Sequence, residues 1–120
     1  MALKVKRVYE TPHAADGMRI LVDRLWPRGI AKDKAKVDLW LKEIAPSNTL
    51  RQRFHAKPEH WDQFRAAYAD ELRSEAAQPK VKELRSYLRR GTVTLLYAAK
   101  DEEHNNAVAL KAWLTRRNKR

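Results

Sequence analysis

Two short apolar runs, each followed closely by charged residues, constrain this chain more than any other feature of its sequence. Ile20–Val22 is continuous and apolar, as expected of a buried strand, and it is followed at once by Asp23. Val93–Tyr97 is the second such run, and it leads to Lys100 and Asp101. In open α/β sheets, ligands bind in the crevice at the carboxyl ends of the strands. The two exits therefore predict where a site lies, but they do not indicate which reaction, if any, takes place there.

The chain between these runs has mostly helical patterns. Val37, Trp40, Leu41 and Ile44 stand at positions i, i+3, i+4 and i+7, which predicts a helix over residues 37–44. Further helices are expected from a cap at Ser47 to His55, from about Pro58 to Ser74, over Lys80–Arg89 up to a cap at Gly91, and over His104–Arg116. Leu3–Tyr9 alternates apolar and basic residues, which is the period of a strand.

These elements predict an α/β fold. We expect a small, mostly parallel sheet of about three or four strands, flanked by helices, with a helical insertion before the last strand. Residues 1–115 would form a single domain, and residues 116–120 a basic C-terminal tail.

Composition excludes several classes of chemistry. The chain has no cysteine, which rules out disulfides, thiolate zinc sites and cysteine nucleophiles. Its three glycines form no phosphate loop or dinucleotide fingerprint, and its histidines show no metal-ligand spacing, so no cofactor and no metal site are predicted. Without a signal peptide or an apolar stretch of about 20 residues, we expect a cytoplasmic protein that does not contact a membrane. The oligomeric state is not predicted.

The first strand exit holds candidate anion-binding residues. Arg24 and Arg28 are four residues apart, and guanidinium groups match phosphate and carboxylate in a bidentate manner. Asp23 could cap loop amides, hold an arginine or act as a base, and Trp26 is counted among the binding residues. The alternative is structural: an ion pair from Asp23 to Arg24 or Arg28 that only fixes the loop.

The second exit holds candidate catalytic residues. His104 is a candidate general acid or base, since its ordinary pKa is near neutrality. Asp101 is a candidate catalytic carboxylate, and its structural alternative is to cap the final helix. Lys100 and Asn105 would add contacts to a ligand bound near the start of that helix. Two further candidates are Tyr97, whose hydroxyl could point into the crevice or simply pack, and Ser47, for which a capping role is the simpler account.

Both exits also carry a resemblance to a known family. The matching segments are Arg19–Gly29, Ala45–Ser47 with Leu50–Arg51, and Leu95–Asp101 with His104, Asn105 and Ala107. In order and spacing they resemble the YeaO-like branch of the bacterial domain-of-unknown-function family number 488, from about Val5 to Leu114. The resemblance implies no established activity.

Longer relatives of that family carry Asp-Val-Arg at the first exit and Cys-His-Arg at the second. By motif position, the resemblance aligns Asp23 and Arg24 with the former and His104 with the histidine of the latter. Asn105 stands where those relatives have arginine, and the cysteine is absent, so no thiol chemistry carries over to this chain.

Two hypotheses follow. In the first, the crevice binds a phosphate- or carboxylate-bearing small molecule and could also catalyse a reaction on it: Arg24 and Arg28 hold the anion, His104 exchanges protons, and Asp23 orients an arginine or a water. This hypothesis requires Arg28 and His104 to lie on the same face.

The alternative is a nucleic-acid-binding module. It rests on the net charge of +11 and on the basic tail. Against it, aromatic residues are not interleaved with the basic residues in the sequence, as stacking platforms usually require.

Overall fold

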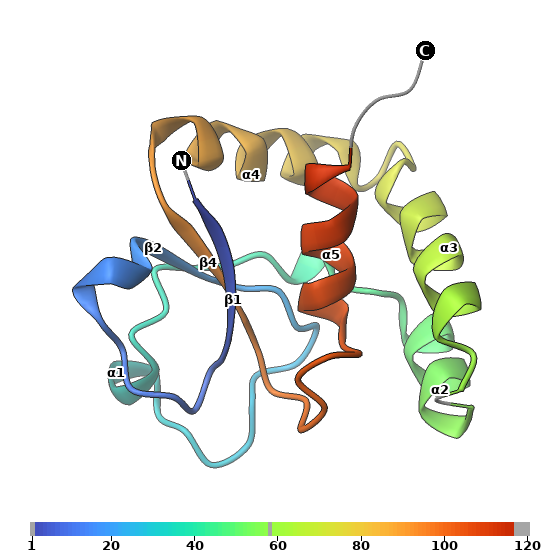
Figure 1. Cartoon of the computed structure of the whole chain (residues 1–120), viewed down its shortest axis with the longest axis horizontal. Coiled ribbons are helices and arrows are strands. Elements are labelled where there is room, and N and C mark those ends of the chain that lie inside the picture. Colours follow the sequence, from blue (N-terminus) through green and yellow to red (C-terminus); the bar gives the residue numbers. More distant parts are fainter. Residues whose placement is uncertain (1, 58, 117–120) are drawn as a thin grey trace.

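The computed structural model describes residues 2–57 and 59–116 and contains a parallel four-stranded sheet flanked by helices (Figure 1). The strands are β1 (Leu3–Arg7), β2 (Met18–Leu21), β3 (Leu39–Trp40) and β4 (Val93–Tyr97). The helices are α1 (Lys32–Ala35), α2 (Asn48–Ala56), α3 (Trp61–Leu72), α4 (Gln78–Arg90) and α5 (Asn106–Thr115). The predicted fold class is confirmed, including the helical segment before the last strand.

The last strand, β4, lies inside the sheet, whose order is β1-β4-β2-β3. It pairs with β1 from Leu3↔Val93 to Arg7↔Tyr97, and with β2 from Met18↔Val93 to Leu21↔Leu96. All its residues are buried, which explains the continuous apolar run in the sequence. Because every pairing is parallel, all four strands end at the same edge of the sheet.

The helix predicted over residues 37–44 is wrong. This segment forms strand β3, paired with β2 as Ile20↔Leu39 and Leu21↔Trp40, and then a 3-10 turn over Lys42–Ile44. Leu39 and Leu41 pack into the core on one side of the sheet, whereas Trp40 packs on the other side. This alternation is that of a strand. The helical spacing was misleading because the side chains on both faces of the strand are apolar, so apolar residues also occur at positions i, i+3, i+4 and i+7.

The other predicted helices are present. Ser47 caps α2 by accepting a hydrogen bond from the Leu50 N–H, and α4 ends at Gly91. The cap predicted at Asp101 is wrong: Asn105 caps α5, because its side chain accepts from the Val108 N–H. Pro58 and the tail residues 117–120 lie outside the described residues. No described helix combines the length and apolarity needed to cross a membrane.

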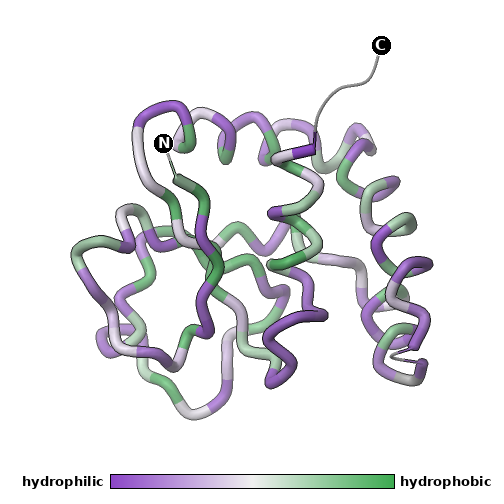
Figure 2. Tube along the Cα trace, in the orientation of Figure 1, coloured by the Kyte–Doolittle hydropathy of each residue, from purple (hydrophilic) through white to green (hydrophobic). Residues whose placement is uncertain are grey.

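The sheet separates two apolar clusters. The larger one contains Ile20, Leu95 and residues of α2–α5, and the smaller one contains Val8, Leu21, Ala35 and Leu96. Figure 2 shows the central strands and α5 as largely hydrophobic, whereas the outer helices alternate between hydrophobic and hydrophilic residues. The long helices therefore cover one face, and α1 with the loops covers the other.

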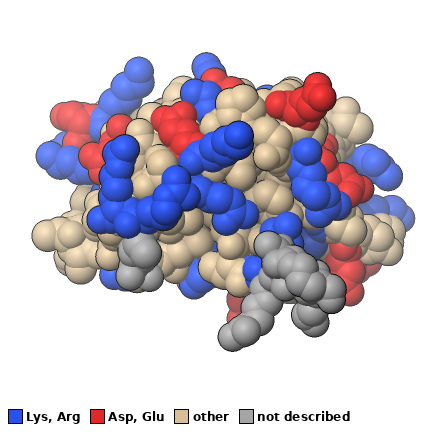
Figure 3. Space-filling view, turned by 90° about the horizontal axis from the view of Figure 1, so that it is seen from above, with Lys and Arg blue, Asp and Glu red and all other residues tan. Residues whose placement is uncertain are grey.

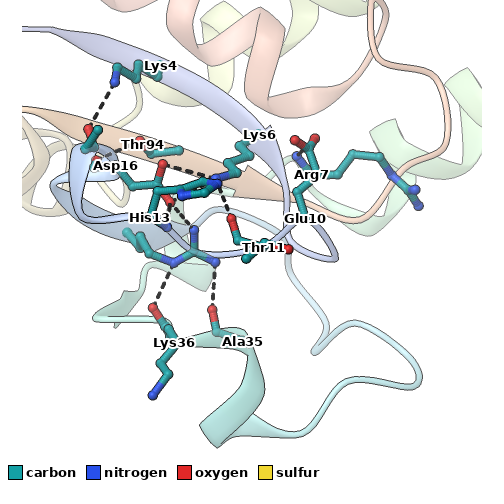
Figure 4. A network of polar contacts seen from close by, with 12 residues as sticks. Lys4, Lys6, Arg7, Glu10, Thr11, His13, Asp16, Ala35, Lys36 and Thr94 are labelled. Carbon is teal, nitrogen blue, oxygen red and sulfur yellow. Dashed lines mark hydrogen bonds and ion pairs between the residues drawn. The ribbon is translucent and has the colours of Figure 1, made fainter.

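A network of polar and charged side chains, the Asp16 cluster (Lys6, Asp16, Arg19 and Thr94), lies outside these apolar clusters (Figure 4). Asp16, Arg19 and Thr94 are buried, and Lys6 is half-buried. Asp16 accepts hydrogen bonds from the Lys6 ammonium at 3.1 Å, from the Arg19 guanidinium and from the His13 N–H. The same guanidinium donates to the carbonyls of Lys36 and Ala35. Burial raises the pKa of the Asp16 carboxyl, but the His13 N–H, Lys6 and Arg19 outweigh burial and bring the pKa down to about 2.

Candidate functional site

A cavity of about 710 Å³ opens at the carboxyl edge of the sheet. Its wall combines the segments after β2 and β4 with the start of α5, Tyr9 after β1, and Pro46 after β3. Helices α2 and α3 close the remaining side through Arg51, Phe54, His55 and Phe64. A volume of about 300–1,000 Å³ is typical of small-molecule sites. The cavity therefore has the size and position of a ligand site in an open α/β sheet.

The structure brings together most of the residues that the sequence singled out. The members that line the cavity are Asp23, Arg24, Trp26, Arg28, Lys100, Asp101, His104 and Asn105. Arg28 and His104 therefore share one cavity, as the small-molecule hypothesis requires. Tyr97 and Ser47 do not line it.

Asp23 connects the segments that form the cavity. Its carboxylate accepts the Ala98 N–H at 3.0 Å and the Asn106 side-chain amide at 2.9 Å, and its carbonyl accepts the Trp40 indole N–H at 2.7 Å. Asn106 also donates to the Val22 carbonyl. Of the roles considered from the sequence, capping a loop amide is the one that the structure shows.

Of the two carboxyl groups that line the cavity, Asp23 is the one whose pKa is raised. Burial raises its pKa above the ordinary value, although the Asn106 amide, the Ala98 N–H and the nearby Arg51 guanidinium each oppose the shift. A carboxyl with a raised pKa in a cleft is the kind of group that functional sites use.

The two arginines after β2 have different environments. The Arg24 guanidinium donates from Nε to the Pro46 carbonyl and from Nη2 to the Ala45 carbonyl, both at 3.1 Å. It therefore ties the first exit to the segment before α2. Arg28 is exposed, and among the described residues its guanidinium has no ion-pair or hydrogen-bond partner, while its carbonyl accepts the Tyr9 hydroxyl. The predicted ion pairs between Asp23 and these arginines are absent from the described part of the chain.

Trp26 closes the wall beside these arginines. Its indole N–H donates to the Ile30 carbonyl at 2.8 Å, and its ring meets that of Trp40 edge-on, with 5.5 Å between centroids. These two contacts fix the orientation of the ring at the cavity.

The second exit is a tight turn before α5. Asp101 accepts the backbone N–H groups of His104 and Glu103, which lower the pKa of its carboxyl. Its other oxygen lies 4.0 Å from His104 Nδ1. The His104 ring stacks on Trp61, with 4.7 Å between ring centroids. His104 thus lies before the helix, at the rim of the cavity, between an acidic side chain and an aromatic ring.

Asn105 and the two remaining predicted residues have structural partners. Asn105 is buried, caps α5 and donates to the Asp101 carbonyl. Ser47 caps α2, and its hydroxyl donates to the Glu71 carboxylate at 2.7 Å, beside a second cavity of about 330 Å³. Tyr97 is buried in the larger core, and burial raises its pKa, with Glu102 and Glu10 adding to the shift.

Sequence reasoning missed the contribution of α2. Arg51, Phe54 and His55 stand at i, i+3 and i+4, so they share one face of the helix, and this face lines the cavity. The signal that could have identified this part of the cavity is the composition of the face. A helix normally packs through an apolar face, but this face mixes charged and aromatic residues. Tyr9 carried no such signal, because its place depends on long-range packing.

The cavity has an excess of positive charge. It is lined by the cations Arg24, Arg28, Arg51 and Lys100 and by the carboxylates Asp23 and Asp101. Within residues 2–57 and 59–116, Arg28, Arg51 and Lys100 form no ion pair. Across the same residues, no cluster of three or more His, Asp or Glu side chains has a geometry that could hold a metal ion. Arg51 donates to the Asn48 side chain at 3.3 Å. The net positive charge of the lining suits an anionic partner.

Fold and site together define a small α/β protein with a ligand-sized, basic cavity at the carboxyl edge of a parallel sheet. The chain belongs to the family described as the inactive DUF488-N3 subclade, whose model matches residues 2–120. It is 43% identical over 114 residues to the uncharacterized protein YeaO of Escherichia coli (strain K12), which covers 95% of this chain and 97% of that protein. It is 41% identical over 115 residues to the uncharacterized protein Rv3073c of Mycobacterium tuberculosis (strain ATCC 25618 / H37Rv), covering 96% and 95%. No solved structure matches the chain significantly. The family resemblance drawn from the sequence is confirmed.

Proposed function

We propose that the cavity at the carboxyl edge binds a small molecule that carries a phosphate or carboxylate group. One observation carries the proposal: Arg28, Arg51 and Lys100 come from three separate segments, line one cavity and form no ion pair with a described residue. Guanidinium and ammonium groups that line one cavity without a salt bridge to a carboxylate are suited to bind an anion. Arg24 adds a fourth positive charge while it fixes the wall.

The description of the family as inactive favours binding without turnover. A reaction in this cavity would have to use His104 and Asp23 for proton transfer, with Asp101 beside His104. The Asp23 carboxylate already accepts two hydrogen bonds that hold the walls together, which supports a positioning role. Recovery of a bound ligand unchanged after long incubation would support binding alone. A product that the wild type forms and the His104→Ala variant does not would assign a catalytic role to His104.

The test of binding is a thermal-shift screen with phosphate, sugar phosphates, nucleotides and carboxylates. Arg51→Ala is compared with Arg53→Ala, because both residues lie on α2 and are exposed, but Arg53 does not line the cavity. A ligand at about a hundred times its Kd adds about 2.7 kcal/mol of stability, which raises the Tm by several degrees. The proposal requires this shift to disappear in Arg51→Ala and to persist in Arg53→Ala. Equal loss in both variants would contradict it.

A second candidate function, nucleic-acid binding, is favoured by one observation on α4. This helix and the residue after α5 carry a basic surface, the α4 surface (Lys82, Arg85, Arg89, Arg90 and Arg116). Arg85 and Arg116 both lie over the Trp113 ring, at 5.4 and 4.5 Å from its centroid. Figure 3, seen from the α4 side, shows a band of Lys and Arg across the middle, with carboxylates mainly to either side. Aromatic and basic side chains thus do lie together here, although the sequence order separates them.

The salt dependence of oligonucleotide binding tests this second function. Lys82→Ala and Lys34→Ala each remove one exposed charge, on α4 and on α1 respectively. If the α4 surface binds nucleic acid, Lys82→Ala makes the negative slope of log K against log salt shallower by about 1, and Lys34→Ala leaves this slope unchanged. The same slope in both variants would exclude the α4 surface.

A further inference from the structure

The cavity wall holds apolar groups that a simple inorganic anion would not use. Among the described residues, two large hydrophobic side chains are exposed, Tyr9 at 41% and Leu25 at 63%, and both line the cavity. They come from different loops, one after β1 and the other after β2. Exposed apolar side chains that gather at a concave site from separate segments indicate a surface for a ligand.

Aromatic rings form a large part of the same wall. Four rings from different segments line the cavity: Tyr9, Trp26, Phe54 and the buried Phe64. Phe54 and Phe64 stack with 4.6 Å between centroids. Trp26 is held by its hydrogen bond to the Ile30 carbonyl and by the Trp40 ring, and the Tyr9 hydroxyl donates to the Arg28 carbonyl. Since each ring has partners in the protein, the rings can meet a bound ring with little rearrangement.

The volume of the cavity also indicates a ligand larger than a simple inorganic anion. A cavity of about 710 Å³ is far larger than a single phosphate or carboxylate needs, and most of its wall is apolar. The positive groups Arg28, Arg51 and Lys100 share this cavity with the rings. A ligand that satisfies both parts of the wall has an anionic group and a flat apolar body.

We infer that the ligand of this cavity is an anion carried on an aromatic ring system, such as an aryl phosphate, an aryl carboxylate or a nucleoside monophosphate. The inference rests on the proposed anion-binding function and names its ligand class. The rings of Tyr9, Trp26 and Phe54 contact the flat body, and Arg28, Arg51 and Lys100 contact the anion.

Calorimetry with matched pairs of probes tests the inference. Phenyl phosphate is compared with methyl phosphate, benzoate with acetate, and AMP with ribose 5-phosphate, so that each pair differs by its ring. Burial of an aromatic ring is expected to tighten binding about tenfold or more within a pair. The pair with the tightest aromatic member identifies phosphate, carboxylate or nucleotide as the source of the anion.

Two variants locate the effect. Leu25→Ser changes a side chain that is 63% exposed, so its effect on folding should be small, and it should reduce the preference for phenyl over methyl phosphate at least threefold. Phe54→Leu, on α2, should reduce the same preference. Arg51→Ala should weaken both probes equally. Equal affinity for both members of every pair would overturn the inference while leaving the proposed function intact. Absence of binding by all probes would overturn both, and an aromatic preference unchanged in both wall variants would overturn the assignment to this wall.

Discussion

The Asp16 cluster and the cavity at the carboxyl edge are both rich in charge, but their charges have different partners. In the Asp16 cluster, the buried Asp16 and Arg19 pair with each other and with nearby carbonyls, N–H groups and Lys6. In the cavity, Arg28 and Lys100 are exposed and pair with no described carboxylate. Charges that satisfy one another stabilise the fold, whereas charges in a cavity that form no ion pair remain available to a ligand. Substitutions should therefore affect stability in the first region and binding in the second.

The largest expected effect is that of Asp16→Ala. It leaves the buried Arg19 and its neighbour Lys6 without a counter-charge, which should lower the free energy of unfolding by about 3–5 kcal/mol. Urea unfolding measures the loss, with Asp33→Ala on the exposed surface of α1 as the control, expected within about 0.5 kcal/mol. A loss below about 1 kcal/mol in Asp16→Ala would show that the cluster is not what stabilises this face.

Two glycines offer a matched comparison between the regions. A Cβ at Gly17, near the Asp16 cluster, would stand 2.3 Å from the Thr92 carbonyl oxygen, and its φ is +66°. Gly29, beside the cavity, has φ +75° with nothing within 4 Å of such a Cβ. Gly17→Ala should therefore cost about 3 kcal/mol, since strain and clash add, and Gly29→Ala about 1 kcal/mol. Equal losses in thermal unfolding would contradict this reading.

The pH dependence of stability should carry the signature of Asp16. Its pKa in the folded protein is about 2, below the 3.8 of the unfolded chain. A lowered carboxyl pKa contributes stability above the unfolded value, and this contribution is lost as the pH falls from about 4 to about 2. The loss amounts to about 2 kcal/mol. The unfolding free energy of the wild type relative to Asp16→Asn should fall by this amount over that range, and a constant difference would refute the assignment.

Ser47 tests whether a residue near the cavity stabilises the fold or binds the ligand. It was a candidate binding residue from the sequence, but its hydroxyl caps α2 and donates to Glu71. Ser47→Ala should lower the free energy of unfolding by about 1 kcal/mol and leave anion affinity unchanged. Ser86→Ala, which removes a hydroxyl bonded to a carbonyl within α4, is the control. A selective loss of anion affinity in Ser47→Ala would return this residue to the binding site.

The smallest effect on stability is expected at the cavity cations. Arg28→Ala and Lys100→Ala should each change the free energy of unfolding by less than about 0.5 kcal/mol, because neither side chain has a described ion-pair partner. The proposed function requires the same variants to lose anion affinity. A loss of stability above 1 kcal/mol in either one would place it with the structural charges.

The convergence of the two exits could be predicted from the sequence, because buried parallel strands end at one edge and their apolar runs are continuous. The hydrogen-bond and ion-pair partners of the charged residues at these exits could not be predicted. Arg24 and Arg28 look alike in the sequence, yet one bonds to carbonyls 21 and 22 residues away, and the other remains exposed. Strand β3 was mistaken for a helix because its two residues are flanked by apolar positions that fit both the helical period of about 3.6 residues and the strand period of 2. The role of Asp16 could not be predicted either, since nothing in the local sequence indicates its contacts with Lys6 and Arg19.

The most direct test of the central claim is a backbone-amide NMR titration of the wild-type protein with phenyl phosphate. It reports where an anion binds without relying on any substitution. The account predicts saturable shifts in the amides of residues 23–29, 50–55 and 98–106, which surround the cavity, and little change along α4. Shifts confined to α4 and the end of α5, or no saturable shift anywhere, would contradict the claim that the unpaired charges at the carboxyl edge form the binding site.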